Sequence, residues 1–164
     1  MAVAVSVIRI GVVSDSHGNY VSLLRAFRQM GDVDLVFHLG DHYRDGTKLA
    51  EQTGATVIGV AGNCDSNLGV THELIELEGA RIYMTHGHTM GVKVGVAELV
   101  KCASRNKCDV VLYGHTHVPK AFSERGILFV NPGSTAHPRH GSAAGYAILT
   151  VAHGKVGAEL YSLA

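Results

Sequence analysis

Several residue types and features are scarce in this chain of 164 residues. The three cysteines, Cys64, Cys102 and Cys108, are an odd number, which argues against a disulfide framework and favours a reducing, cytoplasmic location. Fourteen basic and fourteen acidic side chains give a net charge of zero. The chain therefore lacks the positive field expected of a protein that binds extended nucleic acid or an anionic membrane.

Long hydrophobic runs are also missing. No segment reaches the roughly 18 apolar residues that span a bilayer, and the apolar N-terminus lacks the positive start of a signal peptide and is interrupted by Arg9. The sequence thus predicts neither a membrane span nor secretion. With 46% hydrophobic and 17% charged residues, a chain of this length is expected to form one domain over residues 1–164.

Glycine and histidine are abundant, with 20 and 11 copies, while tryptophan is absent. The histidines are dispersed and lie beside glycine and aspartate, so a purification tag does not explain them. Histidine is the commonest metal ligand among the side chains. Metal chemistry is therefore the first hypothesis for this composition.

Hydrophobic periodicity predicts an α/β fold. The expected strands and helices alternate over residues 7–14, 20–30, 35–39, 46–52 and 56–60. This alternation implies a parallel sheet with right-handed crossovers. The rest of the chain adds a hairpin around Glu78-Gly79, a helix and further strands, which are expected over 73–77, 80–84, 94–104, 110–113, 120–122, 127–130, 146–151 and 155–161.

Five polar clusters follow strand-like runs, and this placement is the main functional signal. The clusters are Asp15-Ser16-His17, Gly40-Asp41, Gly62-Asn63-Cys64-Asp65, His86-Gly87-His88 and His115-Thr116-His117. In open α/β sheets, ligands bind at the carboxyl ends of the strands, so the clusters are expected to meet at one site. Taken alone, most of the clusters are as typical of a turn as of a ligand. The two His-x-His pairs point more strongly to a metal.

The candidate ligands are all oxygen and nitrogen donors. Mixed carboxylate and imidazole ligands suit manganese, iron, cobalt, nickel or zinc better than an all-oxygen calcium site. Six or seven ligands are too many for one tetrahedral zinc, and they suit two ions that share the carboxylate of Asp41. The sequence therefore predicts two divalent transition-metal ions, with manganese as the first choice.

The clusters, in their order along the chain, resemble the motifs of the calcineurin-like metallophosphoesterases. The chain length is similar to that of the small single-domain prokaryotic phosphodiesterases of this superfamily. The late segment Asn131-Pro132-Gly133-Ser134 also resembles a loop of that family. The resemblance implies a two-sheet β-sandwich flanked by helices. It implies one ion held by Asp15, His17, Asp41 and His117, and a second ion held by Asp41, Asn63, His86 and His115.

The resemblance further implies hydrolysis of phosphodiesters by a hydroxide that bridges the two ions, with Asn63 stabilising charge on the phosphate. Many family members have histidine after the motif asparagine, where this chain has Cys64, so the usual proton donor is missing. Two roles are open for His88, contact with phosphate or protonation of the leaving group, and Asp65 is expected to orient His88 or a neighbouring side chain. Cys64 itself could be a reactive thiol or a small buried side chain under the loop, and its residue type favours the buried, inert interpretation.

The expected substrate is a small phosphodiester or nucleotide-like molecule. The alternative is a non-catalytic scaffold, because a eukaryotic vesicle-sorting subunit resembles the same fold and binds partners through its surface. Every expected ligand is present here, which favours catalysis. The oligomeric state is open, and the hairpin over residues 73–84 offers one surface for an assembly of identical subunits.

Overall fold

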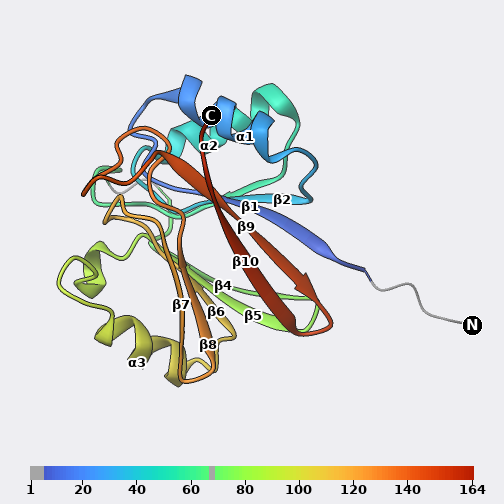
Figure 1. The fold of residues 1–164 in the computed structure, drawn as a ribbon, viewed down its shortest axis with the longest axis vertical. Helices are drawn as coiled ribbons and strands as arrows, with labels where there is room; N and C mark the ends of the chain where they lie inside the picture. The colour runs from blue at the N-terminus through green and yellow to red at the C-terminus, as the bar shows by residue number, and fades with distance from the viewer. Residues whose placement is uncertain (1–5, 67–68) are drawn as a thin grey trace, which may run out of the picture.

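The protein folds into two five-stranded β-sheets that stack on each other (Figure 1). The structure is a computed structural model that describes residues 6–66 and 69–164. The first sheet contains, in spatial order, β10 (Lys155–Ser162), β9 (Gly145–Ala152), β1 (Ile8–Val13), β2 (Leu35–His38) and β3 (Val57–Gly59). The second contains β4 (His72–Leu77), β5 (Ala80–Thr85), β6 (Val110–Leu112), β8 (Ile127–Asn131) and β7 (Lys120–Glu124). This is the two-sheet sandwich that the family resemblance implies.

Each sheet mixes parallel and antiparallel strand pairs. β1, β2 and β3 are parallel neighbours, as are β5, β6 and β8, because the segments between them return the chain to the same end. Antiparallel hairpins extend the sheets at β4, β7 and β10. Aliphatic and aromatic side chains fill the space between the sheets, where Ile10, Phe37, Ile82 and Leu112 are fully buried.

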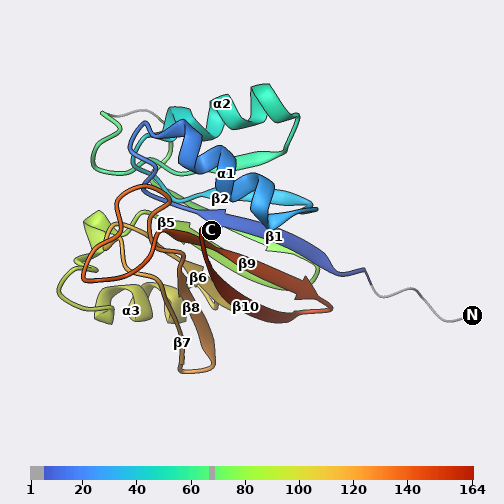
Figure 2. The same cartoon turned by 45° about the horizontal axis from the view of Figure 1, so that its top comes forward.

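Helices cover the outer faces of both sheets (Figure 2). α1 (Tyr20–Met30) and α2 (Tyr43–Thr53) pack Leu23 and Leu49 against the first sheet. α3 (Ala97–Arg105) packs Leu99 against the second sheet, and the short 3₁₀ helix η1 (His88–Met90) precedes it. The layers therefore run helix, sheet, sheet, helix. Within residues 6–66 and 69–164, no helix combines the length and the apolar composition that crossing a membrane requires.

Local signals define α1, whereas a distant residue defines the start of α2. The Asn19 side chain accepts a backbone N–H of the first turn of α1 at 3.1 Å, and Gly31, with a φ of 71°, ends the helix. The predicted range of α1 is confirmed. α2 begins at Tyr43 and not at residue 46, because Asp65 Oδ1 accepts the N–H of Tyr43 at 2.7 Å. Asp65 lies 22 residues after Tyr43 in the chain, so no local sequence pattern predicts this contact.

The ten predicted strands are all present, with ends that differ by a few residues from the expected ones. The hairpin turn at Glu78-Gly79 is also present, since Leu77 pairs with Ala80 across it. The predicted third helix begins at Ala97, three residues later than expected, because the backbone from Gly91 onward first forms a turn. No local signal predicts η1.

Candidate metal centre

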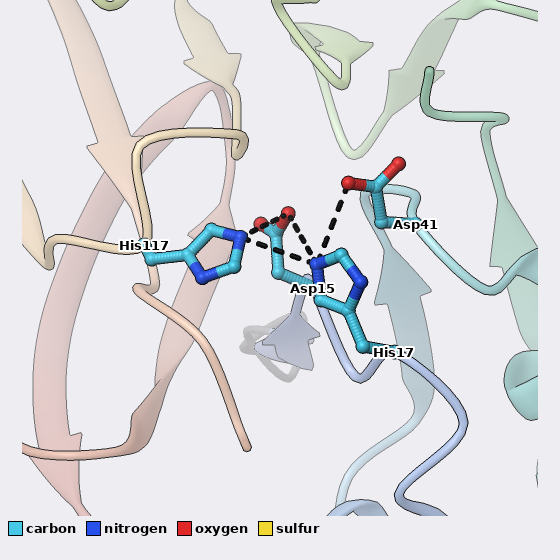
Figure 3. Close-up of side chains that lie close together, drawn as sticks. All are labelled: Asp15, His17, Asp41 and His117. Carbon is cyan, nitrogen blue, oxygen red and sulfur yellow. Dashed lines mark hydrogen bonds and ion pairs between the residues drawn. The ribbon is translucent and has the colours of Figure 1, made fainter. Parts of the chain in front are cut away.

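Four side chains from three loops meet at one end of the sandwich (Figure 3). Asp15 and His17 follow β1, Asp41 follows β2, and His117 follows β6. His117 Nε2 lies 3.1 Å from Asp15 Oδ1, and His17 Nε2 lies 3.5 Å from Asp41 Oδ2. Each residue offers one ligand atom, and these atoms lie within 4.8 Å of one another. We call these four residues the first ligand group.

A second group lies beside the first and shares Asp41 with it. His86 follows β5, and its Nε2 is 3.4 Å from Asp41 Oδ2 and 3.2 Å from His115 Nδ1. Asn63 Oδ1 lies 3.1 Å from the same His86 nitrogen. We call Asp41, Asn63, His86 and His115 the second ligand group. The structure thus brings together all seven residues predicted as metal ligands, in two groups joined by Asp41.

Hydrogen bonds determine which imidazole nitrogen can bind a cation. His117 Nδ1 donates to the carbonyl oxygen of His137 at 2.6 Å, and His86 Nδ1 donates to that of Leu39 at 2.8 Å. Because a carbonyl oxygen only accepts, Nδ1 carries the hydrogen in both rings, and each neutral ring has a lone pair at Nε2. Both Nε2 atoms face carboxylate oxygens, an arrangement that requires a cation or a proton between them.

The buried carboxylate of Asp15 also requires a cation or a proton beside it. Asp15 is fully buried, and its Oδ1 has no hydrogen-bond partner among the residues that the structure describes. Leaving a charged oxygen in this state is costly. Nε2 atoms of His117, His86 and His17 lie 3.1, 3.7 and 3.8 Å from it. The residues present therefore fit a divalent cation with mixed oxygen and nitrogen ligands.

The charges of the site shift its pKa values in opposite directions for acids and bases. Burial acts to raise the pKa of Asp15, but contacts with His117 and His17 hold it well below its usual value. Burial acts in the same way on Asp41, yet contact with His86 lowers its pKa to about 2. Contact with Asp15 raises the pKa of His17, and contact with Asp41 raises the pKa of His86 although burial opposes it. Without metal, the carboxylates and these imidazoles therefore stabilise one another's charged forms.

Most residues of both groups lie in the left-handed backbone region. The φ angle is between 49° and 71° at Asp15, His17, Asp41, His115 and His117. This region costs a non-glycine residue about 1 kcal/mol or more. Gly62 allows the loops to approach each other, because a Cβ there would overlap the carboxylate of Asp41. The backbone thus departs from its preferred conformation where the candidate ligands converge.

Asp65 supports the loop that carries Asp41. Its buried carboxylate accepts backbone N–H bonds from Asp41, Tyr43 and Gly62 at 3.0, 2.7 and 2.7 Å. None of the hydrogen bonds that the structure describes for it reaches His88. Of the two tasks expected for Asp65, the geometry fits the support of a neighbour and not the orientation of His88.

His88 and Cys64 lie at the rim of the site. The ring centre of His88 is 5.3 Å from that of His86, and its buried Nδ1 has no hydrogen-bond partner within the described part of the chain. Burial and the charge of His86 lower the pKa of His88, so the imidazole is neutral near pH 7. Cys64 is exposed, so the prediction of a buried thiol is wrong. Its place in the loop after Asn63 decides its exposure more strongly than the general preference of cysteine for the interior.

Sequence reasoning missed several polar side chains behind the ligands. His38 is buried, and its Nε2 lies 2.8 Å from Ser16 Oγ while its Nδ1 accepts the N–H of Gly40. Asn131 and Ser134 are also fully buried and bond to neighbouring loops. The Asn131-Pro132-Gly133-Ser134 motif signalled this last segment, but pattern alone assigned no task to it.

Comparisons with known proteins identify the family. The model of the calcineurin-like phosphoesterase superfamily domain matches residues 8–154. The chain belongs to this superfamily. A Bacillus subtilis (strain 168) relative named "Probable metallophosphoesterase YsnB" is 35% identical over 155 residues, 93% of this chain and 90% of the relative. "Phosphodiesterase YfcE" of Escherichia coli (strain K12) is 33% identical over 162 residues, with 83% and 84% of the two chains covered.

Solved structures share the fold of this phosphoesterase. A crystal structure of a conserved protein from Streptococcus pneumoniae TIGR4, described as a predicted phosphoesterase, is 36% identical with a TM-score of 0.77, covering 90% of this chain and 85% of that one. Vacuolar Protein Sorting 29 from Cryptosporidium parvum is 19% identical with a TM-score of 0.78, covering 96% and 92%. At that identity the likeness shows the fold alone. Membership of a metallophosphoesterase family implies a hydrolase that uses divalent metal ions.

Proposed function

We propose that this protein is a phosphodiesterase that uses two metal ions, one at each ligand group. The observation that carries the proposal is the shared carboxylate of Asp41, whose Oδ2 lies 3.5 Å from His17 Nε2 and 3.4 Å from His86 Nε2. A carboxylate that faces imidazoles on two sides can bridge two cations. Manganese is the first choice, with iron, nickel, cobalt and zinc as alternatives, because carboxylate and imidazole ligands admit all of them.

Bound at the two groups, a pair of divalent ions supplies hydroxide near neutral pH and positive charge beside the phosphate oxygens. The chain's own residues bind and orient the substrate. The exposed side chain of Asn63 can donate a hydrogen bond to a phosphate oxygen from its amide nitrogen. Because burial lowers the pKa of His88, its neutral ring is better suited to donate a hydrogen bond to phosphate than to protonate a leaving group.

A cavity beside the second ligand group supports a small substrate. It has a volume of about 270 Å³ and is lined by His42, Arg44, Cys64, Asp65 and Ser66. Arg44 contributes positive charge. Partial desolvation and the nearby carboxylate of Asp41 raise the pKa of the exposed Cys64 thiol, so the thiol stays protonated and does not act as a nucleophile. A cavity with a cation and hydrogen-bond donors suits a small phosphodiester or nucleotide-like molecule.

Hydrolysis of a chromogenic aryl phosphodiester tests the proposed function. Protein stripped of metal is resupplied with manganese, nickel, zinc or magnesium in turn, and the matching monoester is assayed in parallel. We expect metal to restore cleavage of the diester, and Asp41→Asn to lower turnover about 10³-fold. Full activity of Asp41→Asn, or of the stripped protein without added metal, would contradict the role of the two ligand groups.

The role of His88 is tested with two diesters that differ in their leaving group. If His88 contacts phosphate, His88→Ala lowers turnover about 10²-fold for a good aryl and a poor alkyl leaving group alike. A loss confined to the poor leaving group would make His88 the proton donor instead. The matched control is His153→Asn in the distant β9–β10 turn, which should leave both rates unchanged.

The alternative is a non-catalytic scaffold of the same fold. Both ligand groups are complete in this chain, which favours catalysis. Folded protein that hydrolyses neither ester with any metal would favour the scaffold and direct the search to binding partners. The cytoplasmic location and an assembly through the hairpin over residues 73–84 stay predictions.

A further inference from the structure

The loop after β8 is the part of the site that the proposed function leaves unused. Ser134 in this loop is fully buried, and its hydroxyl makes three hydrogen bonds. Ser134 Oγ donates to the backbone carbonyl of Asp15 at 2.7 Å and accepts the N–H groups of His137 at 2.8 Å and Ala136 at 3.1 Å. One small side chain therefore joins the end of β1 to a loop that lies 119 residues further along the chain.

The same loop fixes the orientation of His117. The carbonyl oxygen of His137 accepts the hydrogen of His117 Nδ1 at 2.6 Å, which directs Nε2 toward Asp15 Oδ1. Ser134 holds the N–H of His137, the residue whose carbonyl makes this contact. The hydroxyl of Ser134 thus lies between the backbones that position Asp15 and His117, two members of the first ligand group.

The second ligand group is held mainly by other contacts, although the backbone N–H of His115 donates to Asp15 Oδ2 at 3.0 Å. His86 Nδ1 donates to the Leu39 carbonyl, and the backbone N–H of Asp41 donates to Asp65. The backbone of Gly114, next to His115, donates to the carbonyl of His86. None of these bonds passes through Ser134.

We propose that Ser134 is a positioning residue that sets the separation of Asp15 and His117, and thereby the affinity of the first ligand group for its ion. The proposal rests on the two-metal centre of the proposed function. Metal–ligand distances tolerate an error of only a few tenths of an ångström. Partners that orient ligands therefore change metal affinity by about 10- to 100-fold when they are removed. Loss of the Ser134 hydroxyl should weaken the first group much more than the second, whose His115 contacts Asp15 only through its backbone N–H.

The test is a titration of the full, metal-stripped chain with Mn²⁺, followed by calorimetry and electron paramagnetic resonance. We expect the unsubstituted protein to bind two ions and to show the signal of a coupled pair. His17→Ala, which removes a ligand of the first group, and Asn63→Ala, which removes one of the second, assign the two binding steps. Ser134→Ala should weaken the step that His17→Ala removes by about 10-fold or more. The signal of an isolated ion should then replace that of the pair.

A matched control separates positioning from general loss of stability. Thr53 Oγ1 also bonds the backbone twice, to the Leu49 carbonyl and the Ala55 N–H, but it lies at the far end of α2. Thr53→Val should leave both binding steps unchanged. If Ser134→Ala does not fold, Ser134→Cys serves in its place, because a thiol of similar size is a weaker donor and acceptor and should give a smaller loss confined to the first step.

Two results would overturn the proposal. Equal weakening of both binding steps in the Ser134 variants would reduce the residue to a general structural role, and unchanged binding would remove it from the site. A failure of the proposed function is distinguishable, because the unsubstituted protein would then bind fewer than two ions.

Discussion

The two ends of the sandwich both contain non-glycine residues with positive φ, but for different reasons. At one end, Glu78, Arg125 and His153 have φ angles of 47°, 52° and 48°, and each precedes a glycine whose φ is also positive. Strand pairing shows that each pair is a two-residue hairpin turn. Such turns need positive φ at both positions to match the twist of the strands, so the conformation there serves the fold.

At the other end, no hairpin requires the conformation. Asp15 and Asp41 follow parallel strands and could lead into ordinary loops, yet both have positive φ, as do His17, His115 and His117. Their left-handed backbone directs carboxylates and imidazoles toward shared points. The hairpin end is therefore shaped for stability, whereas the site end loses stability to bring its side chains together.

Asp15→Asn should show the difference between the two ends most strongly, because it should change activity much more than stability. We expect turnover to fall about 10³-fold, because the variant cannot supply an anionic ligand. The metal-free protein should lose no more than about 1 kcal/mol. The variant loses the attraction between the carboxylate and the imidazoles, but asparagine tolerates positive φ and its amide can donate to His117 Nε2, 3.1 Å from Asp15 Oδ1. Turnover of the metal-loaded protein and denaturant unfolding in chelator measure the two effects. A loss of about 2 kcal/mol or more would show that Asp15 acts as a structural core residue.

The stability of the metal-free protein should depend on pH through the site end. Burial lowers the pKa of His38, and it lowers that of His115 to about 4. What these two residues contribute to the unfolding free energy is therefore lost as pH falls below the usual histidine value of 6.5. Contacts with carboxylates raise the pKa values of His17 and His86. What these two residues contribute to the unfolding free energy is therefore present below pH 6.5 and is lost as pH rises through their raised pKa values. The unfolding free energy should therefore have a maximum near pH 6.5.

Metal should change this pH dependence. Mn²⁺ at 100 times the dissociation constant of each ligand group is expected to add about 2.7 kcal/mol per bound ion to the unfolding free energy. It should also remove the decline above pH 6.5, because the ions replace the protons on the imidazoles. Thermal or denaturant unfolding at several pH values, with and without chelator, gives both results. A decline that persists with bound metal would contradict binding at these histidines.

Gly79→Ala tests the hairpin end. Gly79 has a φ of 81°, and a Cβ there would lie 3.2 Å from the backbone nitrogen of Gly154 in the neighbouring turn. We expect a loss of about 1 to 2 kcal/mol in unfolding free energy with unchanged turnover. Gly126→Ala is the matched control, because it has a φ of 74° in the same kind of turn with open space around it. Equal losses in both variants would exclude a contribution from the contact between the turns.

Arg125→Asn should give the smallest effect, a gain of about 0.5 kcal/mol in stability. Arg125 lies at the first position of its turn with a φ of 52°, where asparagine is preferred. Arg125→Ala removes the same side chain without this preference and should show no gain. Activity should be unchanged in both variants, since the turn lies at the end of the sandwich opposite the site. A fall in turnover would show that the two ends are coupled.

Local patterns predicted most of the secondary structure because the deciding interactions lie within a few residues. Asn19 and Gly31 define both ends of α1, and the Glu78-Gly79 pair defines a hairpin. The start of α2 could not be predicted, since its cap is the Asp65 carboxylate from another loop. The exposure of Cys64 was missed for a similar reason, because the course of the loop and not the residue type decides it.

The amino-acid sequence identifies which chemical groups follow the strands. Five strand-like runs end in aspartate, asparagine and histidine, and parallel strands must present these ends together. How these groups are divided and held depends on contacts that form only in the folded chain. Asp41 belongs to both ligand groups, Ser134 joins the backbones that position Asp15 and His117, and Asp65 supports the loop of Asp41. Hydrogen bonds between loops far apart in sequence set these separations, and such bonds leave no periodic pattern along the chain.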